Sequence, residues 1–120
     1  MREEVKRWIE KSDSDLKTAK YNLDGRILDA AIFYSQQSVE KAFKALLIER
    51  TKEFPRIHDL TRLARMSKAP EKIIRFCSVI NPGYIVSRYP DQEEEYSLED
   101  TVEIIRSAEE VLKWIKKKLF

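Results

Sequence analysis

The chain has 120 residues, of which 42% are hydrophobic and 37% are charged, with a net charge of +2. This balance predicts one globular domain over residues 1–120 and excludes a disordered chain. The small net charge excludes a global field that would wrap nucleic acid, and the single cysteine excludes an internal disulfide and suits a reducing cytosol. No apolar run approaches the ~20 residues of a membrane span. The charged N-terminal sequence MREEVKRW is unlike a secretory signal. We therefore expect a cytoplasmic protein with no membrane contact.

Apolar residues recur at helical spacing along most of the sequence. This periodicity predicts helices over residues 2–24 and 27–51, a short helix after His58-Asp59, and further helices over about 70–80 and 97–119. Gly25 is expected to close the first helix in the left-handed conformation, and Asn81-Pro82-Gly83 is expected to stop the helix over about 70–80. Ser97 is expected to open the last helix in a capping box that has Asp100 where Glu or Gln is usual. The prediction is an all-α, up-and-down four-helix bundle with an additional short helix.

The second predicted helix is apolar almost all round its axis over the stretch from Ala30 to Leu47, which reads AAIFYSQQSVEKAFKALL. Such a helix is normally buried among other helices or against a partner chain. One polar strip interrupts the apolar surface and carries Gln36, Gln37, Glu40, Lys41 and Lys44. Gln37 and the two lysines could form a shallow cationic groove with Arg88 for the phosphates of a nucleotide. The alternative is a solvated helix face with an ordinary Glu40–Lys44 pair one turn apart.

A segment of about fifteen residues, from Pro82 to Tyr96, is predicted to be a long loop before the last helix, and long loops are disproportionately functional. Arg88 offers paired donors that suit a phosphate group, and Tyr89 offers a ring on which a base can stack. The structural alternative is that Arg88 pairs with Glu40 or an acidic loop residue while Tyr89 plugs the end of the bundle.

Three motifs in this order, YSQQSVEKAFKALL, IHDL and SRYPD, resemble those of the HEPN domains, and the resemblance covers nearly the whole chain. The resemblance implies a bundle of four or five helices that is commonly a homodimer. It also implies nucleotide binding and a gene encoded beside that of a small nucleotidyltransferase. Such pairs often act as toxin and antitoxin. Many HEPN proteins are metal-independent RNases that use an arginine separated from a downstream histidine by four to six intervening residues.

That RNase motif is absent from this sequence. His58 is the only histidine, and the residues at the required spacing are Thr51, Lys52 and Glu53. Lysine has no planar fork for phosphate, so Lys52 does not replace the arginine. His58 could still exchange a proton or hold a phosphate, with Arg88 reaching it in space or across a dimer. The alternative is that His58 only begins the third helix, with its imidazole bonded to backbone.

The sequence contains no metal-ligand cluster and no glycine-rich phosphate loop, so we expect neither a metal nor a cofactor. The predicted nucleotide or phosphate site consists of Gln37, Lys41, Lys44, His58, Arg88 and Tyr89. The expected function is that of a non-catalytic HEPN protein that binds a nucleotide or a nucleotidyltransferase partner, within a toxin–antitoxin pair and as a homodimer. The alternatives are an RNase toxin that cuts RNA with a displaced site of His58 and Arg88, and a purely structural dimerisation module.

Overall fold

The computed structural model describes residues 2–53, 55–86 and 96–120, and within these ranges it contains six helices and no strand. The helices are α1 (Glu3–Asp24), α2 (Leu28–Thr51), α3 (Leu60–Met66), α4 (Glu71–Ile80), α5 (Gly83–Val86) and α6 (Leu98–Leu119). The predicted all-α bundle is confirmed, and the predicted helix ends agree to within about one residue. The prediction of a loop from Pro82 onward is wrong at its start, because the residues after Pro82 form the short helix α5.

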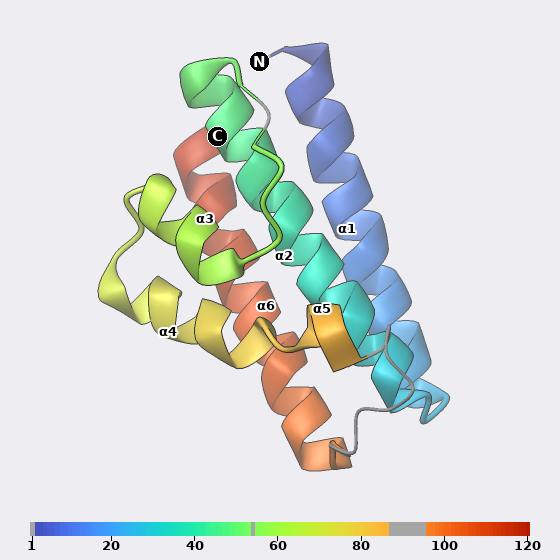
Figure 1. Ribbon diagram of the computed structural model, residues 1–120. Helices are drawn as coiled ribbons and strands as arrows, with labels where there is room; N and C mark the ends of the chain where they lie inside the picture. Colours follow the sequence, from blue (N-terminus) through green and yellow to red (C-terminus); the bar gives the residue numbers. More distant parts are fainter. Residues whose placement is uncertain (1, 54, 87–95) are drawn as a thin grey trace.

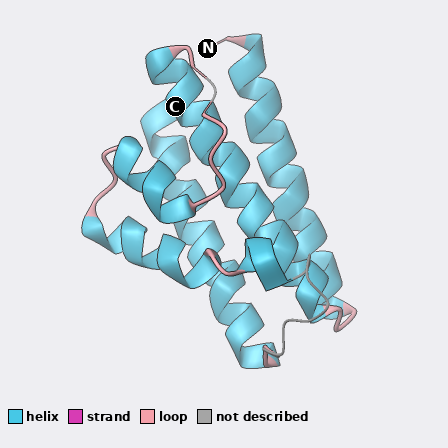
Figure 2. Cartoon of the chain, viewed as in Figure 1, coloured by secondary structure: helices cyan, strands magenta, loops and turns pink. Residues whose placement is uncertain are grey.

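The long helices α1, α2 and α6 run along one another, and α3 and α4 pack beside them (Figure 1). Colouring by secondary structure shows how little of the described chain lies outside helices (Figure 2). Helix α2 contacts all five of the other helices, and fourteen of its 24 residues are buried. Its apolar circumference is therefore covered within a single chain. In the part of the chain that the structure describes, no helix has the length and apolarity needed to cross a membrane.

A pair of serines marks the contact between α1 and α2. The Ser12 hydroxyl donates to the backbone carbonyl of Ser38, and the Ser38 hydroxyl donates to that of Ser12, both at 2.7 Å. Both serines are completely buried. Because serine is small, the two backbones approach closely, and the reciprocal bonds satisfy hydroxyl groups that water cannot reach.

The helix ends confirm one capping prediction and correct another. The Ser97 hydroxyl accepts from the Asp100 N–H, and the Asp100 carboxylate accepts from the Ser97 N–H, so the predicted capping box is present. Gly25 was expected in the left-handed conformation, but its φ is −80°, and the left-handed residue is Arg26 with a φ of 62°. The chain reverses one residue later than predicted, and both the N–H and the guanidinium of Arg26 donate to the Leu23 carbonyl there.

Candidate functional site

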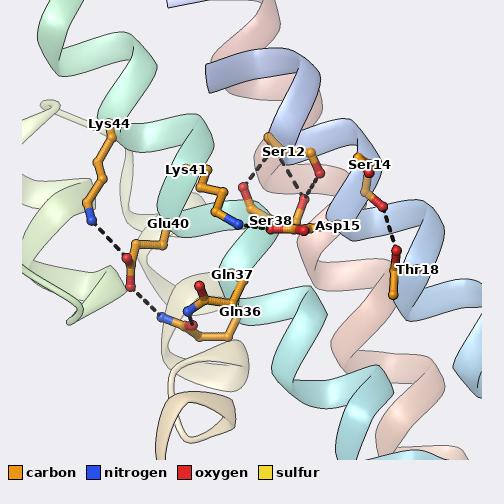
Figure 3. A network of polar contacts seen from close by, with 10 residues as sticks. All are labelled: Ser12, Ser14, Asp15, Thr18, Gln36, Gln37, Ser38, Glu40, Lys41 and Lys44. Atoms are coloured by element: carbon orange, nitrogen blue, oxygen red, sulfur yellow. Dashed lines mark hydrogen bonds and ion pairs between the residues drawn. The ribbon is translucent and has the colours of Figure 1, made fainter. Parts of the chain in front are cut away.

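The centre of the candidate site is Glu40, on the polar strip of α2. Its side chain is only 5% exposed, yet it accepts from three donors: Lys44 Nζ at 2.9 Å, Gln36 Nε2 at 3.1 Å and His58 Nδ1 at 3.0 Å. Figure 3 shows the Lys44 and Gln36 bonds meeting at this carboxylate. Burial acts to raise the pKa of Glu40, but these three hydrogen bonds outweigh it and hold the pKa below its ordinary value of 4.5. Glu40 is therefore a buried carboxylate that stays ionised at neutral pH.

His58 lies just before α3 and is held by contacts on three sides. Because a carboxylate can only accept, the bond to Glu40 requires that Nδ1 carry the proton, so Nε2 is the nitrogen not used by this bond. The His58 carbonyl accepts from Gln36 Nε2 at 3.1 Å. The imidazole stacks on Tyr84 of α5, with ring centroids 4.5 Å apart and planes 13° apart. The imidazole is thus bonded to a carboxylate and not to backbone, and half of the side chain remains exposed.

A concavity of about 240 Å³ opens beside this stacked pair and is lined by His58, Asp59, Asn81, Tyr84 and Ile85. Asp59 caps α3 and accepts from the Thr61 hydroxyl and the Asn81 amide through the same oxygen, Oδ1. The hydrogen bond from Thr61 is the largest cause that lowers the pKa of Asp59 below its usual value of 3.8. The concavity therefore combines two flat rings with a carboxylate and an amide that are already oriented.

The two predicted lysines of α2 are both held by ion pairs within the chain. Lys44 is bonded to Glu40 and lies 5.9 Å from the centre of the Trp8 ring. Lys41 points away from Glu40 and forms an ion pair with Asp15 of α1 (Figure 3). Both lysines thus have a carboxylate partner, so any phosphate that binds to the strip must compete with Glu40 or Asp15.

The predicted site is only partly assembled among the described residues. Gln37 reaches it indirectly, because its amide donates to Gln36 Oε1 at 2.7 Å. Lys44 and His58 meet at Glu40, whereas Lys41 does not join them. Arg88 and Tyr89 lie outside the described residues. Their part in a site therefore stays a prediction.

The sequence did not identify Glu40 as the centre of the site, and it did not place Asn81 or Tyr84 in the site. Glu40 was recognised as a member of the polar strip, but its spacing to Lys44 suggested an ordinary surface pair. Tyr84 was assigned to the loop, and no local signal indicates that it stacks on His58. Asn81 was seen only as a helix stop, whereas its Oδ1 accepts from the Leu60 N–H at 2.8 Å and its amide donates to Asp59.

The described part of the chain shows neither a metal site nor a reactive cysteine. No group of three or more His, Cys, Asp or Glu side chains that could hold a metal ion occurs among residues 2–53, 55–86 and 96–120. Cys77 is buried, and burial raises the pKa of its thiol to about 12. A thiol in such an environment is inert at neutral pH.

The fold of this chain agrees with comparison to known proteins. The HEPN domain model matches residues 5–119, and the chain therefore belongs to the HEPN domain family. A relative from Methanocaldococcus jannaschii is named "Putative toxin MJ1304". It is 31% identical over an alignment of 131 residues, and this alignment covers 93% of this chain and 86% of the relative.

Two solved structures share the fold. The crystal structure of ST0689, an archaeal HEPN homologue, is 32% identical with a TM-score of 0.83 and covers 100% of both chains. The crystal structure of TT1696 from Thermus thermophilus is 23% identical with a TM-score of 0.88, covering 98% of this chain and 99% of the other, and supports the fold alone.

Proposed function

We propose that this HEPN protein is a member of a toxin–antitoxin pair and that it has a non-catalytic role, in which it binds a nucleotide or a small nucleotidyltransferase partner. The membership of the family and the relative named as a toxin support the first part. The non-catalytic role is supported by the residues before His58, because none of Thr51, Lys52 and Glu53 at the spacing of the RNase motif is an arginine. The proposal includes a cytoplasmic homodimer. A monomer in light scattering at micromolar concentration contradicts the homodimer.

The observation that carries the proposal is the orientation of His58. Its ring is fixed by a buried, ionised carboxylate on one nitrogen and by the Tyr84 ring on one face, yet half of its side chain is exposed. Holding an imidazole in one position at the mouth of a concavity lowers the entropy cost of binding. The two rings offer an apolar surface for a base, and the Asp59 and Asn81 side chains offer polar groups for a ribose.

One observation favours the alternative of an RNase. The Glu40 carboxylate fixes the proton on Nδ1, which leaves Nε2 as a proton acceptor when the imidazole is neutral. A carboxylate-oriented imidazole of this kind suits a general base that takes the proton from a ribose hydroxyl. An RNase would then need a phosphate-binding group other than the arginine of the family motif.

Nucleotide titration and RNA incubation separate the two functions. We expect ATP to bind the purified protein in calorimetry, with affinity about tenfold lower in His58→Gln and in Tyr84→Ala because each removes one ring of the stacked pair. Tyr21→Ala is the matched control, since Tyr21 is 80% exposed on α1 and lies outside the concavity. RNA cleavage that disappears in His58→Gln establishes the RNase instead. If ATP does not bind and a nucleotidyltransferase from the same genome does not co-purify on co-expression, the proposed function is wrong.

A further inference from the structure

A second concave surface lies where the C-terminal ends of α2 and α6 come together (Figure 1). We call it the end groove. It has a volume of about 380 Å³, and its polar and aromatic lining consists of Arg50, Thr51, Ser67, Lys68, Trp114 and Lys118. No residue of the end groove belongs to the His58 concavity.

The charges of the end groove are of one sign. Among the described residues, Arg50, Lys68 and Lys118 line it, and no carboxylate does. An adjoining depression that shares Leu47, Thr51 and Met66 has Glu53 on its wall, so the combined lining remains positive. Another groove of the described chain, of about 750 Å³, is lined by four acidic and four basic residues and has no excess of either sign.

Two of the three cations are positioned by side-chain contacts, and none is neutralised by a carboxylate of the described residues. The Arg50 guanidinium donates one hydrogen bond, to the Ser67 carbonyl at 2.6 Å, and four of its five N–H groups are left for other acceptors. The Lys118 ammonium lies over the Trp114 ring, 5.7 Å from its centre. Within residues 2–53, 55–86 and 96–120, no carboxylate forms an ion pair with Arg50, Lys68 or Lys118.

The helix dipole explains only part of this arrangement. Arg50 and Lys118 lie in the last turns of α2 and α6, where a positive charge stabilises a helix. The dipole gives no reason for three separate segments of the chain to direct cations into one concavity. It also gives no reason for the apolar side chains of Leu47 and Met66, the latter 46% exposed, to lie in the same lining.

We propose that the end groove binds the phosphate group of a nucleotide, with the nucleoside against the exposed side chain of Met66. Arg50 supplies a planar fork for two phosphate oxygens, and Lys68 and Lys118 supply point charges beside it. The nucleotide is free or is the terminal residue of an RNA strand, because both present the same phosphate and base. This site lies beyond the function proposed for the His58 concavity and does not depend on it.

The test uses the full chain and three probes: adenosine monophosphate, a short single-stranded RNA with a 5′ phosphate, and the same RNA without it. Binding of the labelled RNAs is measured by fluorescence anisotropy, and binding of the monophosphate by calorimetry. The test variant is Lys68→Gln/Lys118→Gln, which removes two exposed cations from the end groove. The matched control is Lys72→Gln/Lys113→Gln, which removes the same charge from the groove with balanced lining.

We expect the test variant to bind the phosphorylated probes at least about tenfold more weakly than the parent, and the control variant to bind within about twofold. Tighter binding of the phosphorylated RNA than of the monophosphate identifies a strand end, and equal binding identifies a free nucleotide. The proposal is overturned if the parent binds neither phosphorylated probe, if both double variants lose the same affinity, or if neither loses any.

Discussion

Gly83 and Ile32 lie so close together that a β-carbon on Gly83 would be 2.8 Å from the Ile32 carbonyl oxygen and 3.0 Å from its Cγ2. Gly83 has an ordinary negative φ, so it is not required for its conformational freedom. What the position requires is the absence of a side chain, which lets α5 lie directly on α2. Tyr84 is the next residue, and its ring is stacked on His58. The close approach therefore sets the geometry of the candidate site.

The first prediction is that Gly83→Ala destabilises the protein and disturbs the site. The added methyl group meets backbone that cannot move aside, so α5 must shift away from α2. We expect a loss of about 1–3 kcal/mol in the free energy of unfolding, as is typical for overpacking. Urea denaturation measures this loss, and a change in the NMR shifts of the His58 ring protons reports on the stack with Tyr84.

Gly25→Ala is the control for this substitution. A β-carbon on Gly25 would meet only backbone oxygens at 3.7 and 3.8 Å, and its φ of −80° suits alanine. We expect this variant to be at least as stable as the parent, with a gain of up to about 1 kcal/mol from the reduced freedom of the unfolded chain. Equal stability of the two variants would show that α5 does not depend on close contact with α2.

The same glycine shows where prediction from sequence succeeds and where it ends. Helical periodicity predicted five of the six helices, because it depends only on which residues of a segment are apolar. The Ser97 capping box was also predictable, since both its partners lie within one turn. In the same way Asn81-Pro82-Gly83 correctly indicated the end of α4. The contact of Gly83 with Ile32 joins residues about fifty positions apart, and no local pattern contains it.

The candidate site, too, could be predicted from the sequence only where its residues lie on one helix. The polar strip on α2 was visible, because one helix carries all of it. Its use was not visible, because the partners of Glu40 and Lys41 lie on other segments, at His58 and Asp15. An i, i+4 pair of Glu40 and Lys44 looks the same in the sequence whether it is solvated or buried. Only the packing of other helices around α2 decides that it is buried.

A second prediction concerns the serine contact between α1 and α2. Ser12→Ala and Ser38→Ala each remove one buried hydrogen bond, and we expect each to lower the free energy of unfolding by about 1 kcal/mol. The hydroxyl groups are also 3.3 Å apart, so the two effects should be coupled and the double variant should differ from their sum. Ser14→Ala, an exposed position on the same helix, should change stability by less than about 0.5 kcal/mol.

A third prediction concerns the start of α6. Ser97→Ala removes the hydroxyl that accepts from the Asp100 N–H, and the expected cost is about 1 kcal/mol. Ser97→Asp keeps an acceptor at the cap and should recover most of this loss. Chemical denaturation distinguishes the two variants. An alanine variant as stable as the parent would mean that the cap contributes nothing to α6.

The last prediction concerns the buried carboxylate. Glu40→Gln leaves the Lys44 ammonium, whose side chain is 7% exposed, without its carboxylate. At pH 7 we expect a loss of about 3 kcal/mol, because removing one partner of a buried ion pair uncovers the charge of the other. Glu40→Gln/Lys44→Met removes both charges and should recover much of the stability. Glu10→Gln, at an exposed position on α1, is the control and should be close to neutral.

The pH dependence of this loss follows from the direction of the Glu40 pKa. A carboxyl group whose pKa is lower in the folded than in the unfolded chain stabilises the protein fully above its ordinary value of 4.5, and this contribution is lost as the pH falls through the folded value. The parent should therefore lose stability in acid faster than Glu40→Gln, and the difference between them should shrink below pH 4.5. Asp59, whose pKa is also lowered, is present in both proteins and cancels from the difference. Denaturation curves at pH 7, 5 and 3 measure the difference. A difference that stays constant over this range would show that hydrogen bonds from Lys44, Gln36 and His58 do not outweigh the burial of Glu40.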